Sequence, residues 1–323
     1  MVTRRMTIER VVRTALTVAL IAACDRGRRD KPATSPTPVQ APGSSAQAAS
    51  VAKSCTLAPL PLVVPGKPRR VVAIGDLHGD LAAARSALRA AGAIDDSDRW
   101  IGGDLVIVQT GDILDRGDDE SKIFELFEKL TGDARTAGGN IVQLDGNHEL
   151  MNSALDFRYV TPGGMRDFGG ARDKAFTPGG EWAKRLAKFN VIAIVDGTVY
   201  SHAGVTAEWV TQLDAVNLSS RCWLDGQAGG ANDPPIAQTS EDSPVWTRAW
   251  GIPGSEDCAA LTDILAKLGA KRMVVGHTVQ KPGITNACDG KLWRIDVGLA
   301  AGYGGPIEVL EVSDTPRVLK GSR

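Results

Sequence analysis

The chain has 323 residues, of which 43% are hydrophobic, and this is enough to bury a large core in one or two domains. Its 37 basic and 38 acidic residues leave a net charge of −1. A chain with balanced charge has no global field that draws it to nucleic acid or to anionic lipid, so we expect no nucleic-acid partner.

The first 24 residues are typical of an export signal. Four arginines within residues 1–13 precede the uncharged apolar run at 14–23, which is too short to span a bilayer but suits a signal-peptide core. The run ends in IAAC at 21–24, which is similar to the lipobox of bacterial lipoproteins. We therefore expect a signal peptide over 1–24, with an ordinary secretory signal and an incidental cysteine as the alternative. Cys24 would then be lipidated, and the chain would lie on the periplasmic side, attached to the membrane only through this anchor.

Residues 25–54 have the composition of a linker. Proline, alanine, serine and threonine dominate, and no apolar residue is larger than valine. Such a segment cannot bury enough surface to fold, so we expect a disordered tether over 25–54 and a folded domain over 55–323.

Four further cysteines lie in the predicted domain: Cys55, Cys222, Cys258 and Cys288. An even number in an oxidising compartment favours two disulfides, for which three connectivities exist. We favour a Cys222–Cys258 bond, because both residues flank the same polar segment. Four buried free thiols are the alternative.

From about residue 65 the pattern alternates between strands and helices. Short β-branched apolar runs predict strands over 70–74, 105–110, 140–144, 197–201 and 272–275. A period of 3.6 residues predicts helices over 81–91, 121–130, 181–189 and 258–268. The pattern is that of an α/β fold, in which the loops that follow the strands gather at the carboxyl edge of the sheet.

All four histidines of the chain lie in short motifs that contain glycine and follow these strands. The motifs are GDLHG at 75–79, GNHE at 146–149, HAG at 202–204 and GHT at 276–278. A fifth motif, GDILDRG at 111–117, adds two aspartates and an arginine. A lone loop histidine is more often a capped or core residue than a ligand. Five such motifs together predict a site for two metal ions, because Asp, Asn and His are ligands of hard or borderline cations.

The ordered set of motifs resembles the calcineurin-like metallophosphoesterases, in particular the phosphoprotein phosphatase (PPP) superfamily, over residues 74–302. GNHE continues as Leu150, Met151 and Asn152, and the fourth motif is HAG; both features are similar to the Shewanella-like, bacterial-type branch. The resemblance implies a layered fold, with central β-sheets flanked by helices and a dinuclear metal site at the carboxyl edge of the strands.

The resemblance also implies the metal ligands. Asp76 and His78 would hold one metal. The other would be held by Asn147, His202 and His277, and Asp112 would bridge the two. A carboxylate can bind two cations through its two oxygens, which agrees with the bridging role. Oxygen and nitrogen ligands suit two divalent or mixed-valence ions of Mn, Fe or Zn, and a water that bridges them would attack phosphorus.

The remaining motif residues resemble the catalytic groups of the family. His148 would be the general acid, and Asp115 would orient its imidazole. Arg116 would grip the phosphate oxygens as a planar fork. A second phosphate-binding arginine corresponds, by a looser match, to Arg248.

Several nearby residues have a simpler explanation. We expect Asp80 to cap the helix that starts at residue 81, and Glu149 to anchor the backbone around the site. Trp223, Trp246 and Trp250 either line a substrate cleft or pack the segment 205–257, the part least like the family, in which 226–235 is predicted to be loop.

We therefore expect a hydrolase that acts on phosphate monoesters, in particular a protein phosphatase whose substrate is a phosphorylated protein or a small phosphoester. The alternative is a nucleotide or dinucleotide phosphodiesterase or pyrophosphatase of the same fold. A non-catalytic binding lipoprotein is disfavoured, because His148, Asp115 and Arg116 are all present. The sequence does not choose between phosphotyrosine and phosphoserine.

Overall fold

The computed structural model describes residues 55–323, so the predicted signal peptide, the anchor at Cys24 and the predicted tether lie outside the described residues. The strands are β1 (Val71–Ile74), β2 (Val106–Gln109), β3 (Asn140–Gln143), β4 (Ile192–Val195), β5 (Thr198–Ser201), β6 (Arg272–Val275), β7 (Thr285–Ala287), β8 (Leu292–Arg294), β9 (Glu308–Val312) and β10 (Arg317–Lys320). The helices are α2 (Leu81–Ala90), α3 (Glu120–Thr136), α4 (Asn147–Ser153), η1 (Phe168–Gly170), α5 (Arg172–Phe176), α6 (Glu181–Leu186), α7 (Leu213–Leu224), α8 (Ile236–Thr239) and α9 (Cys258–Leu268). None of the helices in 55–323 has the length and hydrophobicity that a membrane crossing requires.

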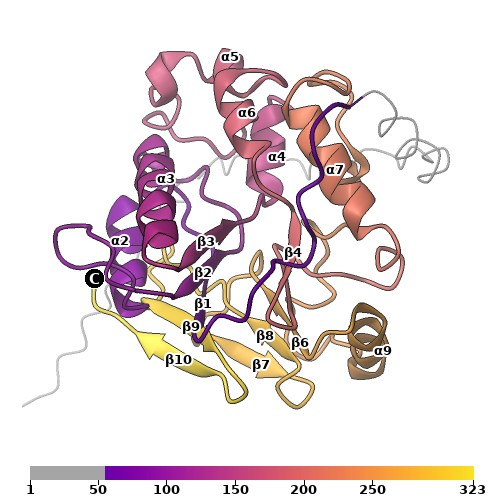
Figure 1. Ribbon diagram of the computed structural model, residues 1–323. Coiled ribbons are helices and arrows are strands. Elements are labelled where there is room, and N and C mark those ends of the chain that lie inside the picture. Colours follow the sequence, from indigo (N-terminus) through magenta and orange to yellow (C-terminus); the bar gives the residue numbers. More distant parts are fainter. Residues whose placement is uncertain (1–54) are drawn as a thin grey trace, which may run out of the picture. The chain divides into compact units, whose positions relative to one another are not determined.

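The strands form two sheets of five (Figure 1). The first has the order β10-β9-β1-β2-β3, in which β1, β2 and β3 are parallel. The second has the order β4-β5-β6-β8-β7, in which β5, β6 and β8 are parallel. In both sheets the antiparallel strands lie toward the edges, so the parallel strands deliver their following loops to one end.

The core has an inner layer between the two sheets and an outer layer under the helices. Along β1, Val71 and Ala73 belong to the inner layer, whereas Val72 and Ile74 belong to the outer one. Successive side chains of a strand point to opposite faces, so a strand buried on both faces must be apolar throughout. This is why the strands that precede the motifs are continuous β-branched runs.

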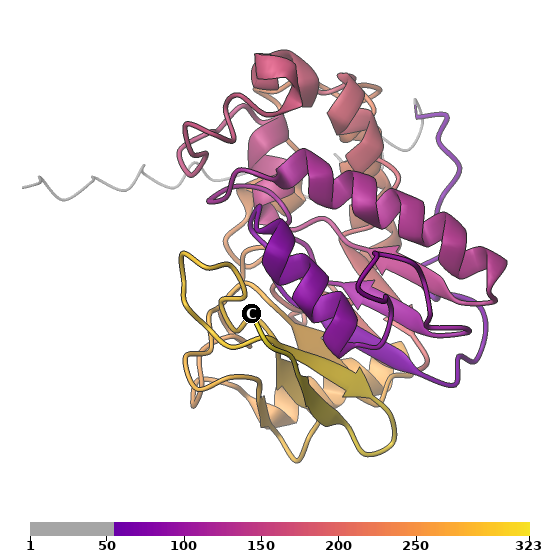
Figure 2. The ribbon, with the colours of Figure 1, turned by 90° about the vertical axis from the view of Figure 1, so that its left-hand side faces the viewer.

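Helices cover the outer faces of the sheets. Figure 2 shows α2 and α3 lying over the first sheet, and α9 packs its apolar residues into the same outer core layer as β6. The predicted cap of α2 is confirmed, because the Ala83 N–H donates to the Asp80 carboxylate over 2.9 Å. The fold class predicted from the sequence is confirmed.

The disulfide prediction was wrong. The bonds join Cys55 to Cys222 and Cys258 to Cys288, with Cα separations of 5.9 and 5.2 Å. Cys258 begins α9, the helix before β6. Cys288 lies in the turn between β7 and β8, and β8 is the neighbour of β6 in the sheet. Proximity along the chain misled the prediction, because the order of strands in the sheet decides which cysteines meet.

Candidate dinuclear metal centre

The six predicted ligands follow five different strands, and the fold brings them to one end of the two sheets. Backbone turns are tight at these positions: φ is +45° at His78, +58° at Asp112 and +65° at His277. Non-glycine residues rarely adopt this left-handed conformation, and it is typical of functional sites. Glycine is required beside them, since a Cβ at Gly276 would lie 2.3 Å from Oδ1 of Asp76.

His202 is the centre of one group of ligand atoms. Its Nδ1 lies 3.0 Å from the carbonyl oxygen of Thr110, which can only accept, so this nitrogen carries the proton. Its Nε2 lies 2.8 Å from Oδ1 of Asn147, 3.1 Å from Nδ1 of His277 and 3.3 Å from Oδ2 of Asp112. Oxygen and nitrogen atoms that converge in this way are ligands suited to a cation.

A second group forms on the other side of Asp112. Nδ1 of His78 donates to the carbonyl of Leu114 over 3.0 Å, and its Nε2 lies 3.8 Å from Oδ2 of Asp112. Asp76 is held close by, because its carboxylate accepts the N–H of His277 at 3.2 Å. Asp112 therefore lies between the two groups, as a bridging ligand must.

The titration behaviour of these residues suits a cation site. Burial lowers the pKa of His78 to about 4 and that of His277 to about 2, so both imidazoles are neutral and able to ligate near pH 7. Burial, together with the carboxylates of Asp296 and Asp112, raises the pKa of Asp76 well above its usual range. Among residues 55–323, Nε2 of His277 is buried without a hydrogen-bond partner. The residues present therefore fit two metal ions.

Asp296 was missed by the sequence analysis. It is buried, and burial raises its pKa to about 6 beside Asp76. It follows β8 shortly after the strand ends, as Asp76 follows β1. An aspartate just after a buried strand was the signal that could have identified it.

His148 lies at the edge of the cluster with its ring held on one side. Nδ1 is 2.5 Å from Oδ2 of Asp115, while Nε2 faces Oδ2 of Asp112 at 3.7 Å and Nη2 of Arg116 at 3.3 Å. Burial lowers the pKa of His148, but Asp112 and Asp115 raise it by more, so the net pKa is above its usual value. His148 also lies close enough to His78 and Asp112 to share a cation with them. We do not assign His148 as a metal ligand, because Asp115 holds its Nδ1 and its Nε2 faces Arg116.

The two predicted phosphate-binding arginines lie beside different parts of the cluster. Arg116 is exposed, and its guanidinium carbon lies 4.8 Å from the ring centre of Tyr159 and 5.4 Å from that of Tyr303. Arg248 is also exposed and donates to Oγ1 of Thr278 over 3.0 Å, next to the ligand His277. Arg116 therefore adjoins His148, and Arg248 adjoins the group of ligand atoms centred on His202.

Arg172 is a buried support that no motif predicts. Its Nη2 lies 3.2 Å from Oδ1 of Asp115, and its Nη1 pairs with Glu120. Its Nε donates to Asn152 over 2.8 Å, and Asn152 donates to Oδ1 of Asp115 over 2.9 Å. Each oxygen of Asp115 thus has its own partners, which fixes the carboxylate that holds His148.

Glu149 has the anchoring role expected from the sequence. Its carboxylate accepts the backbone N–H groups of Gly146, Asp112, Ile113 and Leu114 at 2.7 to 3.1 Å. One side chain therefore ties the start of α4 to the loop that follows β2.

The three tryptophans have different environments. Trp223 and Trp250 are buried and pack the core, and a Cβ at Gly204 would collide with Trp250 at 2.3 Å, which explains the glycine of HAG. Trp246 is half-buried, and its ring lies edge-on to His277 at 6.0 Å. Of the three, Trp246 is the one placed beside the ligands.

Residues 69–281 match the family model described as calcineurin-like phosphoesterase. The chain belongs to this family. It is 39% identical to Shewanella-like protein phosphatase 2 of Arabidopsis thaliana, over 76% of this chain and 75% of that protein. It is 31% identical to Shewanella-like protein phosphatase 1 of Plasmodium berghei, over 73% of this chain and 69% of that protein. The chain thus lies in the Shewanella-like branch of the PPP superfamily.

A solved structure agrees with this placement. The cold-active protein-tyrosine phosphatase of a psychrophilic Shewanella species is 26% identical, with a TM-score of 0.67 over 81% of this chain and 83% of that one. As a member of the metallophosphoesterase family, this chain is a metal-dependent hydrolase of phosphoester bonds.

Proposed function

We propose that this phosphoesterase removes phosphate from phosphorylated proteins, with His148 as the proton donor. The observation that carries the proposal is the position of His148: Asp115 holds Nδ1, and Nε2 faces Arg116 and Asp112. A donor held in this way next to an arginine suits a leaving oxygen that departs from a bound phosphate.

Asp76, His78 and Asp112 would hold one cation, and Asp112, Asn147, His202 and His277 would hold the other. When bound, such a pair of cations neutralises phosphate charge and acidifies the attacking water. Manganese is the ion we propose, although the oxygen and nitrogen donors suit iron and zinc equally well.

The protein's own groups would perform the other parts of the reaction. Arg116 and Arg248 bind phosphate oxygens from two sides and orient phosphorus. His148 donates its Nε2 proton to the leaving oxygen, and Asp115 stabilises the charged imidazole until that moment. Arg172 and Asn152 keep Asp115 in place.

The substrate class is supported by relatives whose names say protein phosphatase. The test is turnover by the full chain on phosphotyrosine peptide, phosphoserine peptide, nucleoside monophosphate and bis(p-nitrophenyl) phosphate. We expect the highest kcat/KM on a phosphopeptide. A preference for the diester or the nucleotide would overturn the protein phosphatase proposal and support the diesterase alternative.

We also propose that the chain is exported, that the signal peptide is cleaved just before Cys24 and that Cys24 then carries a lipid on the periplasmic side of a membrane, with 25–54 as a tether to a domain over 55–323. The two disulfides support this proposal, because such bonds persist in oxidising compartments.

A further inference from the structure

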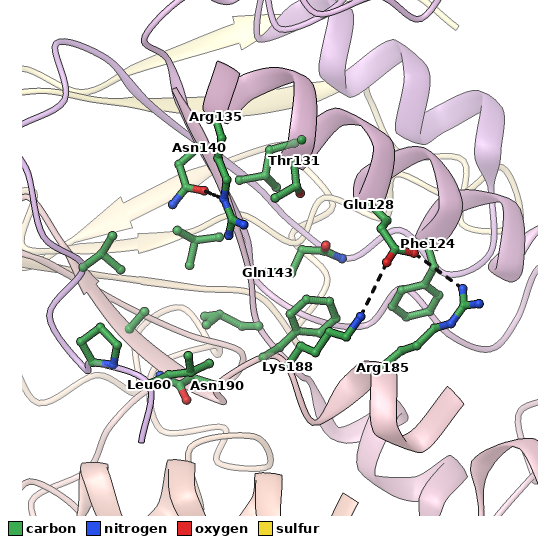
Figure 3. A pocket seen from close by; sticks show the side chains of 18 of the residues that line it. Leu60, Phe124, Glu128, Thr131, Arg135, Asn140, Gln143, Arg185, Lys188 and Asn190 are labelled. Atoms are coloured by element: carbon green, nitrogen blue, oxygen red, sulfur yellow. Dashed lines mark hydrogen bonds and ion pairs between the residues drawn. The ribbon is translucent and has the colours of Figure 1, made fainter. Parts of the chain in front are cut away.

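A groove lies along the edge of the first sheet, outside the candidate metal centre (Figure 3). Its volume is about 510 Å³, within the range of sites that bind ligands. One wall is α3, another is the segment 60–65, and β3 with the loop before β4 forms the floor and one end. Apolar side chains from all of these elements line it, among them Leu60, Phe124 and Phe189.

The edge of β3 presents free peptide groups to this groove. The N–H groups of Asn140 and Leu144 donate toward β2, whereas the N–H of Asp145 donates the other way, to Asn190. Backbone groups alternate in direction along a strand, so those of Ile141 and Gln143 point away from β2. Within residues 55–323, β3 pairs only with β2, so these groups have no strand partner. An open edge of this kind is a template for another strand.

Two buried amide side chains in the groove also lack partners. Nε2 of Gln143 and Oδ1 of Asn190 make no hydrogen bond with any residue of 55–323, although the side chains are only 7% and 6% exposed. Both residues line the groove (Figure 3). A buried polar atom without a partner is costly, and one free donor with one free acceptor matches the two polar groups of a peptide bond.

The charge of the groove is unbalanced. Arg135, Arg185 and Lys188 line it, against a single carboxylate, Glu128. Arg185 pairs with Glu181 at 3.0 Å, outside the groove, and Glu128 lies 3.7 Å from Arg185 and 3.6 Å from Lys188. Arg135 makes no ion pair with any residue of 55–323 and donates to the neutral Asn140. An acidic occupant would therefore be favoured over a basic one.

We propose that this groove binds an extended peptide segment of a partner protein, with apolar and acidic side chains, which adds to β3 as a sixth strand. The backbone of the peptide pairs with Ile141 and Gln143, and its apolar side chains pack against the walls. Its acidic side chains contact the cationic rim, which consists of Arg135, Arg185 and Lys188. This inference goes beyond the proposed function and does not depend on which phosphoester the enzyme cleaves.

The test measures binding of synthetic peptides to the full chain by fluorescence anisotropy. The probe is capped Asp-Val-Thr-Val-Asp, compared with Lys-Val-Thr-Val-Lys and with an acidic peptide that is N-methylated at alternate residues. We expect both comparison peptides to bind at least about tenfold more weakly, the first through charge and the second through lost strand pairing. Amide hydrogen exchange at Ile141 and Gln143 should slow when the acidic peptide is added.

Two variants locate the site. Gln143→Leu removes the unpartnered donor, and Lys188→Glu reverses the rim charge; each should weaken the acidic peptide about fivefold or more. Lys267→Glu, on the exposed face of α9, is the matched control and should bind as the wild type does. Hydrolysis of p-nitrophenyl phosphate should be unchanged in all three, which shows that they are folded.

Several results would overturn the proposal. These are equal binding of the acidic and N-methylated peptides, no slowing of exchange at Ile141 and Gln143, no binding of any peptide, or the same loss in Lys267→Glu as in Lys188→Glu. If Gln143→Leu does not fold, Lys188→Glu and the exchange measurement still decide. Because the assay reads binding alone, its failure leaves the proposed catalytic function untouched.

Discussion

At the scale of single residues, the decisive feature is a carboxylate whose two oxygens are used differently. Oδ2 of Asp115 meets His148, and Oδ1 receives Asn152 and Arg172. Because neither oxygen is free to rotate toward another partner, the imidazole is held in one orientation with its proton on Nδ1 when neutral. Nε2 can then gain and lose a proton without any movement of the ring.

Replacement of His148 by asparagine tests its role as proton donor. His148→Asn should lower kcat by about 10² to 10⁴, the usual worth of general acid catalysis. The loss should be smallest for p-nitrophenyl phosphate, larger for phosphotyrosine and largest for phosphoserine, since poorer leaving groups need the proton more. Steady-state kinetics and metal analysis are the measurements. Equal losses on the three substrates, or loss of metal, would show that His148 is a ligand or a structural residue.

The pH dependence should reveal the influence of Asp115. The pKa of His148 is raised above 6.5, so its acid form persists above that pH and is lost as pH rises through the raised value. Asp115→Asn removes one cause of the increase, so the alkaline limb of kcat should move to lower pH. A pH–rate profile measures this, with the exposed Asp118→Asn as control. An unmoved limb would mean that another group sets it.

At the scale of elements, some parts of the fold could be predicted and others could not. Strands that precede the motifs are continuous apolar runs because both their faces are buried, and all five are confirmed near the predicted bounds. In contrast, β7 and β8 have three residues each, and β10 is an edge strand with exposed polar ends, so they carry little pattern. The helix predicted over 121–130 continues to Thr136, and the one predicted over 181–189 ends at Leu186.

The helix α7 shows why a polar sequence can hide a buried element. It lies in the segment 205–257, and its Asn217 and Arg221 are buried. Asn217 accepts the N–H groups of Val191 and Ile192, and Arg221 donates to the carbonyl of Ala187. Because tertiary hydrogen bonds satisfy these side chains, the helix needs no clean apolar stripe.

The candidate site, like the fold, has residues that could be predicted from the sequence and residues that could not. Its ligands lie in motifs with glycine and could be selected from the sequence, and the fold brings them together. Arg172 and Asp296 contribute through tertiary contacts alone, with Arg172 in a short helix that no motif marks. Their neighbours are decided by packing, which a single sequence does not display.

Glu149 links two elements, and its replacement should loosen both. Glu149→Gln turns one of its two acceptor oxygens into a donor that faces backbone N–H groups, which should cost about 1–3 kcal/mol of unfolding free energy. Metal affinity should also fall, because Asp112 and Asn147 lie on the two segments that Glu149 joins. Urea unfolding and metal titration measure the two effects. Glu125→Gln, on the exposed face of α3, is the matched control and should change neither.

At the scale of the whole molecule, hydrolysis of every substrate should require bound metal. Chelation should abolish hydrolysis by the full chain, and added Mn²⁺ should restore it. Asp112→Ala should lose both metals, since Asp112 lies between the two groups of ligands. Metal content per chain, measured by mass spectrometry, is the readout. A variant that retained two metals would contradict the bridging assignment.

Membrane attachment should be separable from catalysis. Cys24→Ser should release the protein from membranes, because one residue carries the proposed anchor. Its kcat and KM on p-nitrophenyl phosphate should equal those of the wild type. Fractionation of cells followed by immunoblotting measures the release. Recovery of the wild type entirely in the soluble fraction would refute the lipobox interpretation.

The bond between Cys55 and Cys222 also has a mechanical consequence. Cys55 is the first described residue, and its sulfur is joined to a buried cysteine of α7, 167 positions along the chain. A pull on the chain before residue 55 therefore passes across this covalent link and continues from α7. The residues between the two cysteines carry no tension, and they include five of the six proposed ligands as well as the wall and the floor of the β3 groove. A phosphatase pulled by its N-terminal end would thus keep the loops that carry these five ligands, and its groove, unstretched.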